Sequence, residues 1–224
     1  MYLKAVCFTL ILCITLCIYA DAHGDVYRHA DTERKLIALT FDDGPHYKYT
    51  EEILDILKKY GVKATFFMIG ANAEKHPHLA RRVFSEGHEI GNHTYSHPHL
   101  KGLSENDIQK EIEASSAVIE KITGSRPTLF RPPEGFCGKE VTAAAENMGY
   151  TVILWSQDTR DWAHNAPEKI SSDIINNVRC GDIILFHDFI TPSTPTPAAL
   201  EKIIPHLCND GYEFVTVSEL IAQN

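Results

Sequence analysis

Short apolar runs alternate with amphipathic stretches along the chain from Lys35 onward. The runs have the length of buried strands, whereas the amphipathic stretches carry apolar residues at helical spacing and mostly stop near a glycine. We expect strands over 36–41, 64–69, 89–92, 129–131, 151–155, 183–187 and 213–216. A chain in which strand and helix alternate in this way folds with right-handed crossovers and a parallel sheet.

The stretches between these strands predict helices, and several carry a start signal. Thr50 is expected to cap the first helix, and Ser104 precedes Glu-Asn-Asp, a favourable helix start. Pro167 stands at the first turn of another helix, where the missing N–H of proline costs nothing. The expected helices are 50–60, 74–85, 104–122, 139–148, 167–178 and 196–207.

Unusual polar residues gather at or just beyond the carboxyl ends of the expected strands. They are Asp42, Asp43, His93, His97, Arg131, Asp158, Asp161 and His187. Because these strand ends meet on one face, the side chains are predicted to surround the active face of a (β/α) barrel. A doubly wound open sheet is the alternative, but its glycine-rich phosphate turn is missing from the sequence.

Two of these groups suggest a metal site. Asp42 and Asp43 end the first strand just before Gly-Pro, a turn signal, and His93 and His97 follow another strand. A spacing of four residues would put both imidazoles on one side of a helical turn, within reach of one cation. Either stretch alone is more typical of a turn or of ordinary histidines. Together, they favour an open site in which one carboxylate faces a metal and the other faces substrate.

Three later motifs add groups to the same face. Arg131 can clamp a carboxylate through two hydrogen bonds, although a rigid loop with a surface arginine is equally compatible with its Pro-Pro-Glu-Gly sequence. In the segment 155–162, an acid can orient a neighbour and Trp162 can cover a sugar face or simply fill a gap. His187 ends a buried strand at this end of the barrel, which favours a general acid over a core histidine.

Residues 1–22 are expected to be a secretory signal peptide and not part of the fold. A lysine precedes a long apolar run, and Ala20-Asp21-Ala22 permits cleavage. The run is short for a membrane span, which disfavours a retained anchor. A lipoprotein signal would use Cys13 or Cys17, but leucine precedes each instead of a small residue. Residues 23–34 are interpreted as a polar lead-in to one domain.

Charge and cysteine content narrow the function classes. The formal net charge is −9 and stays −9 without residues 1–22, because that segment holds one charge of each sign. An acidic chain without basic runs argues against nucleic acid and anionic membranes as partners. The remaining cysteines, Cys137, Cys180 and Cys208, lack Cys-x-x-Cys spacing, which excludes a zinc knuckle. One disulfide with one free thiol and three free thiols are both compatible with them.

The five motifs, in this order, resemble the polysaccharide deacetylase family, also called the NodB homology domain or carbohydrate esterase family 4. The resemblance covers about residues 35–220, and its most specific parts are Thr-Phe-Asp-Asp-Gly and His-Thr-x-x-His. Gly-His-Glu-Ile-Gly-Asn-His and Asp-Gly-Tyr-x-Phe-Val-Thr-Val are also similar to the family. The family implies an irregular (β/α)₇ barrel in a single α/β domain.

The resemblance also implies a metal and a base. Asp43, His93 and His97 would hold a divalent ion, most often Zn²⁺, with positions left open for water and the substrate carbonyl. Asp42 would take a proton from that water as the general base. Arg131 would hold Asp42 in place.

The other implied roles concern the leaving group and the substrate. His187 would protonate the leaving amine, and Asp161 would orient His187 or Arg131. The backbone N–H of Glu134 would help to stabilise the oxyanion. The substrate-binding residues implied by the resemblance are Glu134, Trp162, Leu185 and Pro133. The sequence departs from the family at Glu134, where Tyr or another residue is common, and this change could alter substrate preference.

These parts predict a secreted, monomeric hydrolase that removes N-acetyl groups from an N-acetylated polysaccharide. Peptidoglycan is expected first, because export would place the enzyme beside the cell wall, and chitin or its oligomers are the alternative. A barrel glycosidase would use two carboxylates and would leave the histidine pair unexplained. A non-catalytic carbohydrate-binding module would be expected to lack one of the motif residues, and none is missing.

Overall fold

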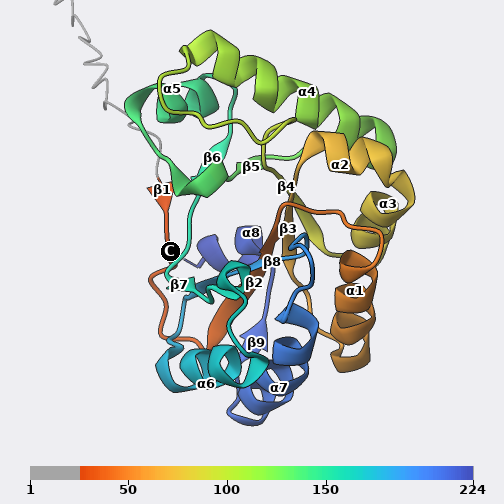
Figure 1. Cartoon of the computed structure of the whole chain (residues 1–224). Coiled ribbons are helices and arrows are strands. Elements are labelled where there is room, and N and C mark those ends of the chain that lie inside the picture. Colours follow the sequence, from red (N-terminus) through yellow and green to blue (C-terminus); the bar gives the residue numbers. More distant parts are fainter. Residues whose placement is uncertain (1–25, 224) are drawn as a thin grey trace, which may run out of the picture.

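The computed structural model describes residues 26–223 as one α/β domain built on a parallel sheet (Figure 1). The sheet has nine strands in the order β1-β6-β5-β4-β3-β2-β8-β7, and β9 pairs with β2. Figure 1 shows the sheet curled around a central axis with helices along its outside. The predicted barrel is confirmed. It is irregular because its path through the described residues ends at β1 and β7 and leaves the sheet open there.

Each strand predicted from the apolar runs is present within two residues of its expected ends. The strands are β1 (Val26–Tyr27), β2 (Leu36–Asp42), β3 (Thr65–Met68), β4 (Glu89–Asn92), β5 (Leu129–Phe130), β6 (Thr151–Ile153), β7 (Gln157–Asp158), β8 (Ile183–His187) and β9 (Glu213–Phe214). β2 is buried along its whole length between β3 and β8, which explains its continuous apolar run.

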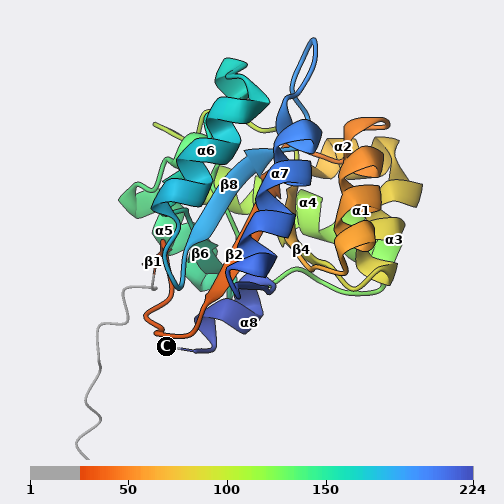
Figure 2. The same ribbon diagram turned by 90° about the horizontal axis from the view of Figure 1, so that it is seen from below.

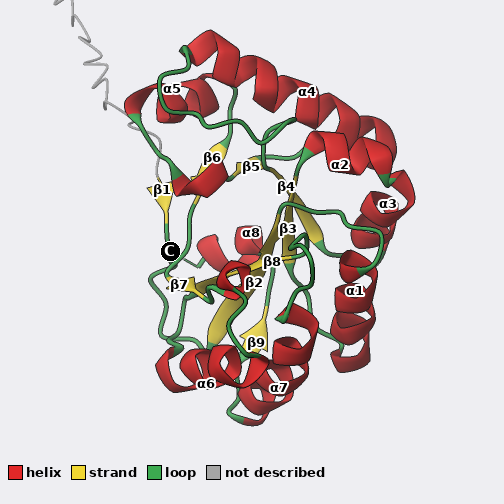
Figure 3. Ribbon diagram, in the orientation of Figure 1, coloured by secondary structure: helices red, strands yellow, loops and turns green. Residues whose placement is uncertain are grey.

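The helices surround the sheet (Figure 3). They are α1 (Tyr49–Tyr60), α2 (Gly70–Lys75), α3 (Pro77–Ser85), α4 (Glu105–Thr123), α5 (Lys139–Asn147), α6 (Pro167–Asn177), α7 (Thr196–Asn209) and α8 (Val217–Ile221), with short 3₁₀ turns η1 (Pro133–Gly135) and η2 (Asp161–Ala163). The cap predicted at Ser104 is confirmed, because its side chain accepts a hydrogen bond from the N–H of Asp107. Pro167 begins α6 as predicted.

Two helix predictions were wrong in detail. The expected helix 74–85 is two helices, because Pro77 begins a new one and cannot continue the hydrogen-bond ladder of the turn before it. Thr50 does not cap α1, whose first residue is Tyr49. The Thr50 hydroxyl instead accepts from the N–H of His46 and donates to Asp188.

The polar lead-in was also misread, since part of it belongs to the sheet. β1 pairs in parallel with β6, with Val26 opposite Val152. Ala30 is buried, and its N–H donates to the carbonyl of Gly181. The fold therefore begins before Lys35. The predicted signal peptide, residues 1–22, lies outside the described residues.

The amino-terminal end of the barrel is closed by α8, which lies where β2 starts (Figure 2). Val217 and Leu220 of α8 share one buried cluster with Leu36 and Ala38 of β2. This cluster packs α8 against the start of β2, at the end of the strands opposite to Asp42.

Two further properties bear on the sequence predictions. No helix within residues 26–223 combines the length and the apolar character that a membrane crossing requires.

Cys137, Cys180 and Cys208 are all free thiols, so the single-disulfide alternative is not the one adopted.

Candidate metal centre and active site

A cavity of about 470 Å³ opens at the carboxyl ends of the strands. Its lining is rich in carboxylates, imidazoles and indoles. The lining residues are Asp42, Asp43, His93, His97, Glu134, Trp155, Asp158, Trp162, Leu185 and His187. Six of the eight residues predicted at this face line the cavity, although they come from separate strands and loops, whereas Arg131 and Asp161 are buried outside the lining.

Asp42 and Asp43 both reach the cavity because the chain turns sharply between them. Asp42 is the last residue of β2, and Asp43 has a φ of 77°, which is uncommon for a residue other than glycine. The turn is held from two sides. The N–H of Asp188 donates to the carbonyl of Asp42 at 3.1 Å, and Asn72 Nδ2 donates to the carbonyl of Asp43 at 2.7 Å. Such strain persists only where the surroundings fix it.

His93 and His97 are close together, but the helical turn expected between them is absent. The segment after β4 is a loop in which Thr94 and His97 have φ values of 65° and 55°. The carboxylate of Glu111 accepts hydrogen bonds from the N–H groups of Tyr95 and Ser96, which holds this loop in shape. The left-handed residues return the chain on itself, so the two imidazoles converge without a helix.

Asp43, His93 and His97 fit a divalent ion. Oδ1 of Asp43 lies 3.4 Å from Nε2 of His93 and 3.3 Å from Nε2 of His97. Ligands about 2.0–2.1 Å from a tetrahedral ion would be about 3.3 Å apart. Oδ1 of Asp43 is also buried without a hydrogen-bond partner, as expected of an atom that awaits a ligand.

The second ring nitrogen of His93 also supports a metal site. Its Nδ1 lies 2.6 Å from the carbonyl oxygen of Arg131, which can only accept, so Nδ1 carries a proton, and in the neutral ring Nε2 then offers its lone pair to a ligand. Burial opposes charge on Asp43, yet the surrounding imidazoles, His93 first, lower the pKa of the Asp43 carboxyl and favour its ionised form. An ionised carboxylate beside a neutral imidazole is the donor set that a divalent ion takes up.

Arg131 contacts Asp42 differently from the predicted two-pronged clamp. It is fully buried, and only Nη1 reaches Asp42, donating to Oδ1 at 2.7 Å. Its other hydrogen bonds run from Nη1 to the Thr40 hydroxyl, from Nε to the carbonyl of Ile153 and from Nη2 to the carbonyl of Leu154, as a buried guanidinium requires. Arg131 thus supplies the countercharge of Asp42 while tying β2 to the end of β6.

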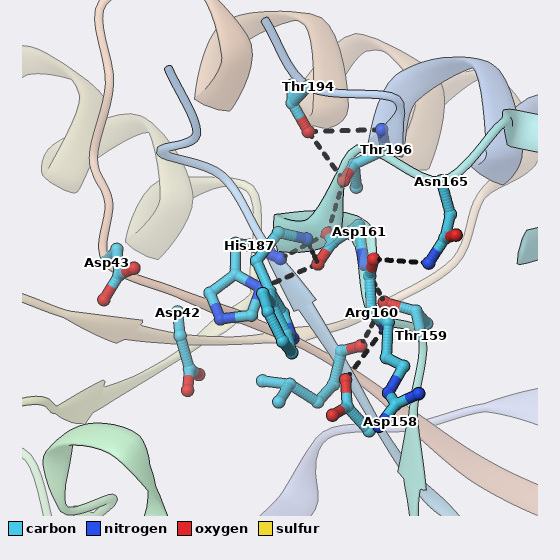
Figure 4. Close-up of polar contacts among 12 residues, drawn as sticks. Asp42, Asp43, Asp158, Thr159, Arg160, Asp161, Asn165, His187, Thr194 and Thr196 are labelled. Atoms are coloured by element: carbon cyan, nitrogen blue, oxygen red, sulfur yellow. Dashed lines mark hydrogen bonds and ion pairs between the residues drawn. The ribbon is translucent and has the colours of Figure 1, made fainter. Parts of the chain in front are cut away.

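His187 lies on the side of the cavity that faces Asp42 and Asp43 (Figure 4). Its Nδ1 is 2.7 Å from Oδ1 of Asp161, which is fully buried. Burial opposes the charged form, but Asp161 and the charges of Asp42 and Asp43 raise the pKa of His187 to about 9. Of the two residues that Asp161 was predicted to orient, His187 is the one that it contacts.

The predicted substrate residues divide into two groups. Glu134, Trp162 and Leu185 line the cavity, whereas Pro133 is buried and stands outside the lining. Glu134 has a φ of 56°, and its carboxylate is 2.9 Å from Nδ1 of His99.

Sequence reasoning missed Trp155 as a lining residue and placed Asp158 at the active face without giving it a role. Both lie in the motif that was singled out for Trp162 and Asp161. Trp155 was placed in the predicted strand, but β6 ends at Ile153, so this indole belongs to the loop above the barrel. Asp158 was noted at a strand end, which was the only signal that could have found it.

Gly44, which follows the two carboxylates, should not tolerate a side chain. A Cβ at this position would lie 2.1 Å from Oδ2 of Asp188, which is itself buried. We expect Gly44→Ala to lower the free energy of unfolding by about 1–3 kcal/mol and to weaken metal binding, because the loop carrying Asp43 must shift. Denaturant unfolding and metal titration measure both effects. Gly138→Ala, where the added methyl meets the Phe136 ring at 3.1 Å and Glu140 Oε2 at 3.7 Å, is the matched control. Equal metal affinity in both variants would contradict this account.

Comparison with known proteins gives consistent matches. The sequence pattern of the family described as "Polysaccharide deacetylase" matches residues 29–153. A peptidoglycan-N-acetylglucosamine deacetylase of Bacillus cereus is 44% identical over 200 residues, which cover 88% of this chain and 93% of that protein.

Solved structures agree with this match. A peptidoglycan N-acetylglucosamine deacetylase in complex with 4-naphthalen-1-yl-N-oxidanyl-benzamide superposes with a TM-score of 0.85 at 36% identity, covering 88% of this chain and 92% of that one. An acetyl xylan esterase from Clostridium thermocellum, in complex with a cobalt ion, has a TM-score of 0.78 at 40% identity and covers 84% and 91%. With the barrel, the five motifs and these matches together, the chain belongs to the polysaccharide deacetylase family.

Proposed function

We propose that this protein is a metal-dependent hydrolase that removes N-acetyl groups from a glycan, with peptidoglycan N-acetylglucosamine or N-acetylmuramic acid residues as its first substrate. The observation that carries the proposal is the arrangement of one cavity. A three-ligand group, a carboxylate countered by a buried arginine, and an imidazole held by a buried carboxylate all face the same space. Amide hydrolysis needs an activated water, a polarised carbonyl and an acid for a poor leaving group.

Each group has a proposed part in that reaction. Asp43, His93 and His97 would hold a divalent ion, which would supply polarisation of the carbonyl and a more acidic water. Asp42 accepts the proton of the attacking water, and Arg131 keeps the Asp42 carboxylate in place. His187 gives its proton to the amine nitrogen as the carbon–nitrogen bond breaks. The N–H of Glu134 donates to the developing oxyanion.

The remaining proposed contacts concern the substrate. Trp162 is 52% exposed at the cavity rim, which leaves an indole face free for a sugar ring. Leu185 is buried in the cavity wall and gives the acetyl methyl an apolar surface. We propose Pro133 as a support beneath Glu134 instead of a direct contact, because it is buried outside the lining.

His187 should control the alkaline limb of the pH profile. As the proton donor it must be charged, so activity should fall as the pH rises through its pKa, which lies at about 9 without a neighbouring cation and lower with one. His187→Ala should reduce kcat by about 10²–10⁴-fold and abolish this limb while metal content stays at the wild-type level. Initial rates from about pH 5 to about pH 10, together with metal analysis, test this expectation, because that range spans the usual pKa of histidine. A variant that kept the alkaline limb would assign the acid role to another group.

The metal and the cellular location complete the proposal. We propose Zn²⁺ because two imidazoles and one carboxylate are typical of catalytic zinc sites. Cobalt is the alternative, since the similar acetyl xylan esterase is described in complex with a cobalt ion. We also propose that residues 1–22 direct export and are removed, so that a monomeric enzyme acts on the cell wall. Nucleic acid and the membrane are not proposed as partners.

One experiment separates the function classes. The purified protein is incubated with peptidoglycan, chitooligosaccharide and acetylated xylan, and released acetate is assayed while mass spectrometry follows chain length and acetylation. We expect acetate release with chains of unchanged length, fastest on peptidoglycan. Faster release from chitooligosaccharide or xylan would change the substrate assignment. Shortened chains without acetate would indicate a glycosidase, and binding without any product would indicate a carbohydrate-binding module.

A further inference from the structure

The carboxylate that holds His187 is itself held by four hydrogen bonds. Oδ1 of Asp161 accepts from Nδ1 of His187 at 2.7 Å and from the N–H of Trp162 at 2.8 Å. Oδ2 accepts from the N–H of His187 at 2.8 Å and from the Thr196 hydroxyl at 2.6 Å. Of these donors, only Thr196 brings a side chain from a third element, the start of α7.

The surroundings of Thr196 direct its hydroxyl proton toward the Asp161 carboxylate (Figure 4). It is fully buried, as is Asp161, so neither side chain exchanges its partner for bulk water. The Thr194 hydroxyl donates to Oγ1 of Thr196 at 2.8 Å and accepts from the Thr196 N–H at 3.2 Å. An ionised carboxylate can only accept, so the Thr196 proton points to Asp161.

This contact joins two loops at the rim of the cavity. Thr196 lies at the end of the long connection from β8 to α7, whereas Asp161 begins η2 after β7. Without the Thr196 hydroxyl, Oδ2 would keep only the backbone N–H of His187, and the buried carboxylate could rotate about its Cβ–Cγ bond. Rotation would turn Oδ1 away from Nδ1 of His187 and release the ring.

We propose that Thr196 is a positioning residue, whose hydroxyl fixes the rotation of the Asp161 carboxylate and thereby aims His187 at the leaving group. The inference rests on the proposed deacetylation, in which His187 is the proton donor. Three carboxylates face His187, namely Asp161 from η2 and Asp42 and Asp43 at the end of β2. Thr196 contacts the first of these, so its effect should be confined to the orientation of the acid.

The test compares three variants of the full chain. Thr196→Val removes the hydroxyl at nearly constant shape, and Thr196→Ser restores it. Thr65→Val is the matched control, because Thr65 is also fully buried and donates to a carboxylate, Glu89 Oε2, at 2.9 Å, but outside the cavity lining. Should Thr196→Val fold poorly, Thr196→Ala removes the same group without crowding.

The kinetic result should separate kcat from KM. We expect Thr196→Val to lower kcat by about 10- to 100-fold, the scale of one lost hydrogen bond to a charged group, with KM and metal content unchanged. Thr196→Ser should recover most of the rate, and Thr65→Val should keep it. Equal losses in the Ser and Val variants, or an equal loss in Thr65→Val, would overturn the proposal.

A spectroscopic signal makes the test independent of the reaction. In ¹H NMR, the Nδ1 proton of His187 should be slow to exchange and shifted downfield by its bond to Asp161. It should be lost or moved in Thr196→Val, and preserved in Thr196→Ser and Thr65→Val. If the wild-type protein releases no acetate from any glycan, the proposed function fails while this signal still tests Thr196. An unchanged signal in Thr196→Val would refute the positioning role, whatever the activity.

Discussion

His93→Ala is expected to lose bound metal and deacetylase activity together. His93 is buried, and its Nε2 atom faces Oδ1 of Asp43 while Nδ1 is held by the carbonyl of Arg131. Alanine leaves only Asp43 and His97, and two ligands hold a divalent ion poorly. Activity should fall to the background of the assay. Elemental analysis of the purified variant, measured beside acetate release, checks both parts of this expectation.

A surface histidine gives the control for this variant. His206 forms an exposed pair with Asp210 on α7, and His206→Ala should keep both metal and rate. Chelation of the wild-type protein should reproduce the His93→Ala result, and added divalent ion should restore activity to the wild-type protein alone. Full activity in a preparation shown to contain no metal would contradict the proposed metal dependence.

Asp42→Asn is expected to lower kcat by at least about 10²–10⁴-fold, the usual contribution of a general base. The amide oxygen can still accept from Nη1 of Arg131, but the side chain can no longer take a proton from water. A second cost falls on stability, because the buried Arg131 loses its countercharge. Breaking such a pair typically costs about 3–5 kcal/mol.

The two effects of Asp42→Asn have separate readouts. Circular dichroism and thermal unfolding report the folded fraction, and rates are taken well below the lowered Tm. Arg131→Lys removes most of the fixed donors while keeping a positive charge near Asp42, so it should lower stability with a smaller loss of rate per folded molecule. A folded Asp42→Asn enzyme with nearly normal kcat would exclude Asp42 as the base.

Much of the fold could be predicted because its central strands are long apolar runs. β4 and β8 have their predicted bounds, and β2 is only one residue longer than predicted. The missed strands, β1 and β7, have two residues each and carry no run that periodicity could detect. Their place in the sheet depends on pairing with β6 and β8, which are distant in sequence.

The site was predictable in its membership and less so in its geometry. Strand ends gather on one face of a parallel barrel, so Asp43, His93 and His97 could be expected together before their loops were known. The backbone path from His93 to His97 could not be predicted. It depends on left-handed conformations at Thr94 and His97 and not on a helical turn. The partners of Arg131 likewise depend on which carbonyls the end of β6 presents.

Contacts between loops left the weakest trace in the sequence. Thr196 lies 35 residues from Asp161, in a Thr- and Pro-rich connection with no periodic pattern. Trp155 lines the cavity because β6 ends at Ile153, before the end of the apolar run that predicted the strand. Residues of this kind can be assigned only when the packing of neighbouring loops is known.

The central claim is the division of labour between two adjacent carboxylates, and metal content tests it most directly. Asp42→Asn and Asp43→Asn are purified in parallel, and their bound metal is measured by elemental analysis against the wild-type protein. We predict that Asp42→Asn keeps wild-type metal content without activity, whereas Asp43→Asn loses metal and activity together. If Asp42→Asn is stripped of metal while Asp43→Asn retains it, the ligand and the base have been assigned the wrong way round.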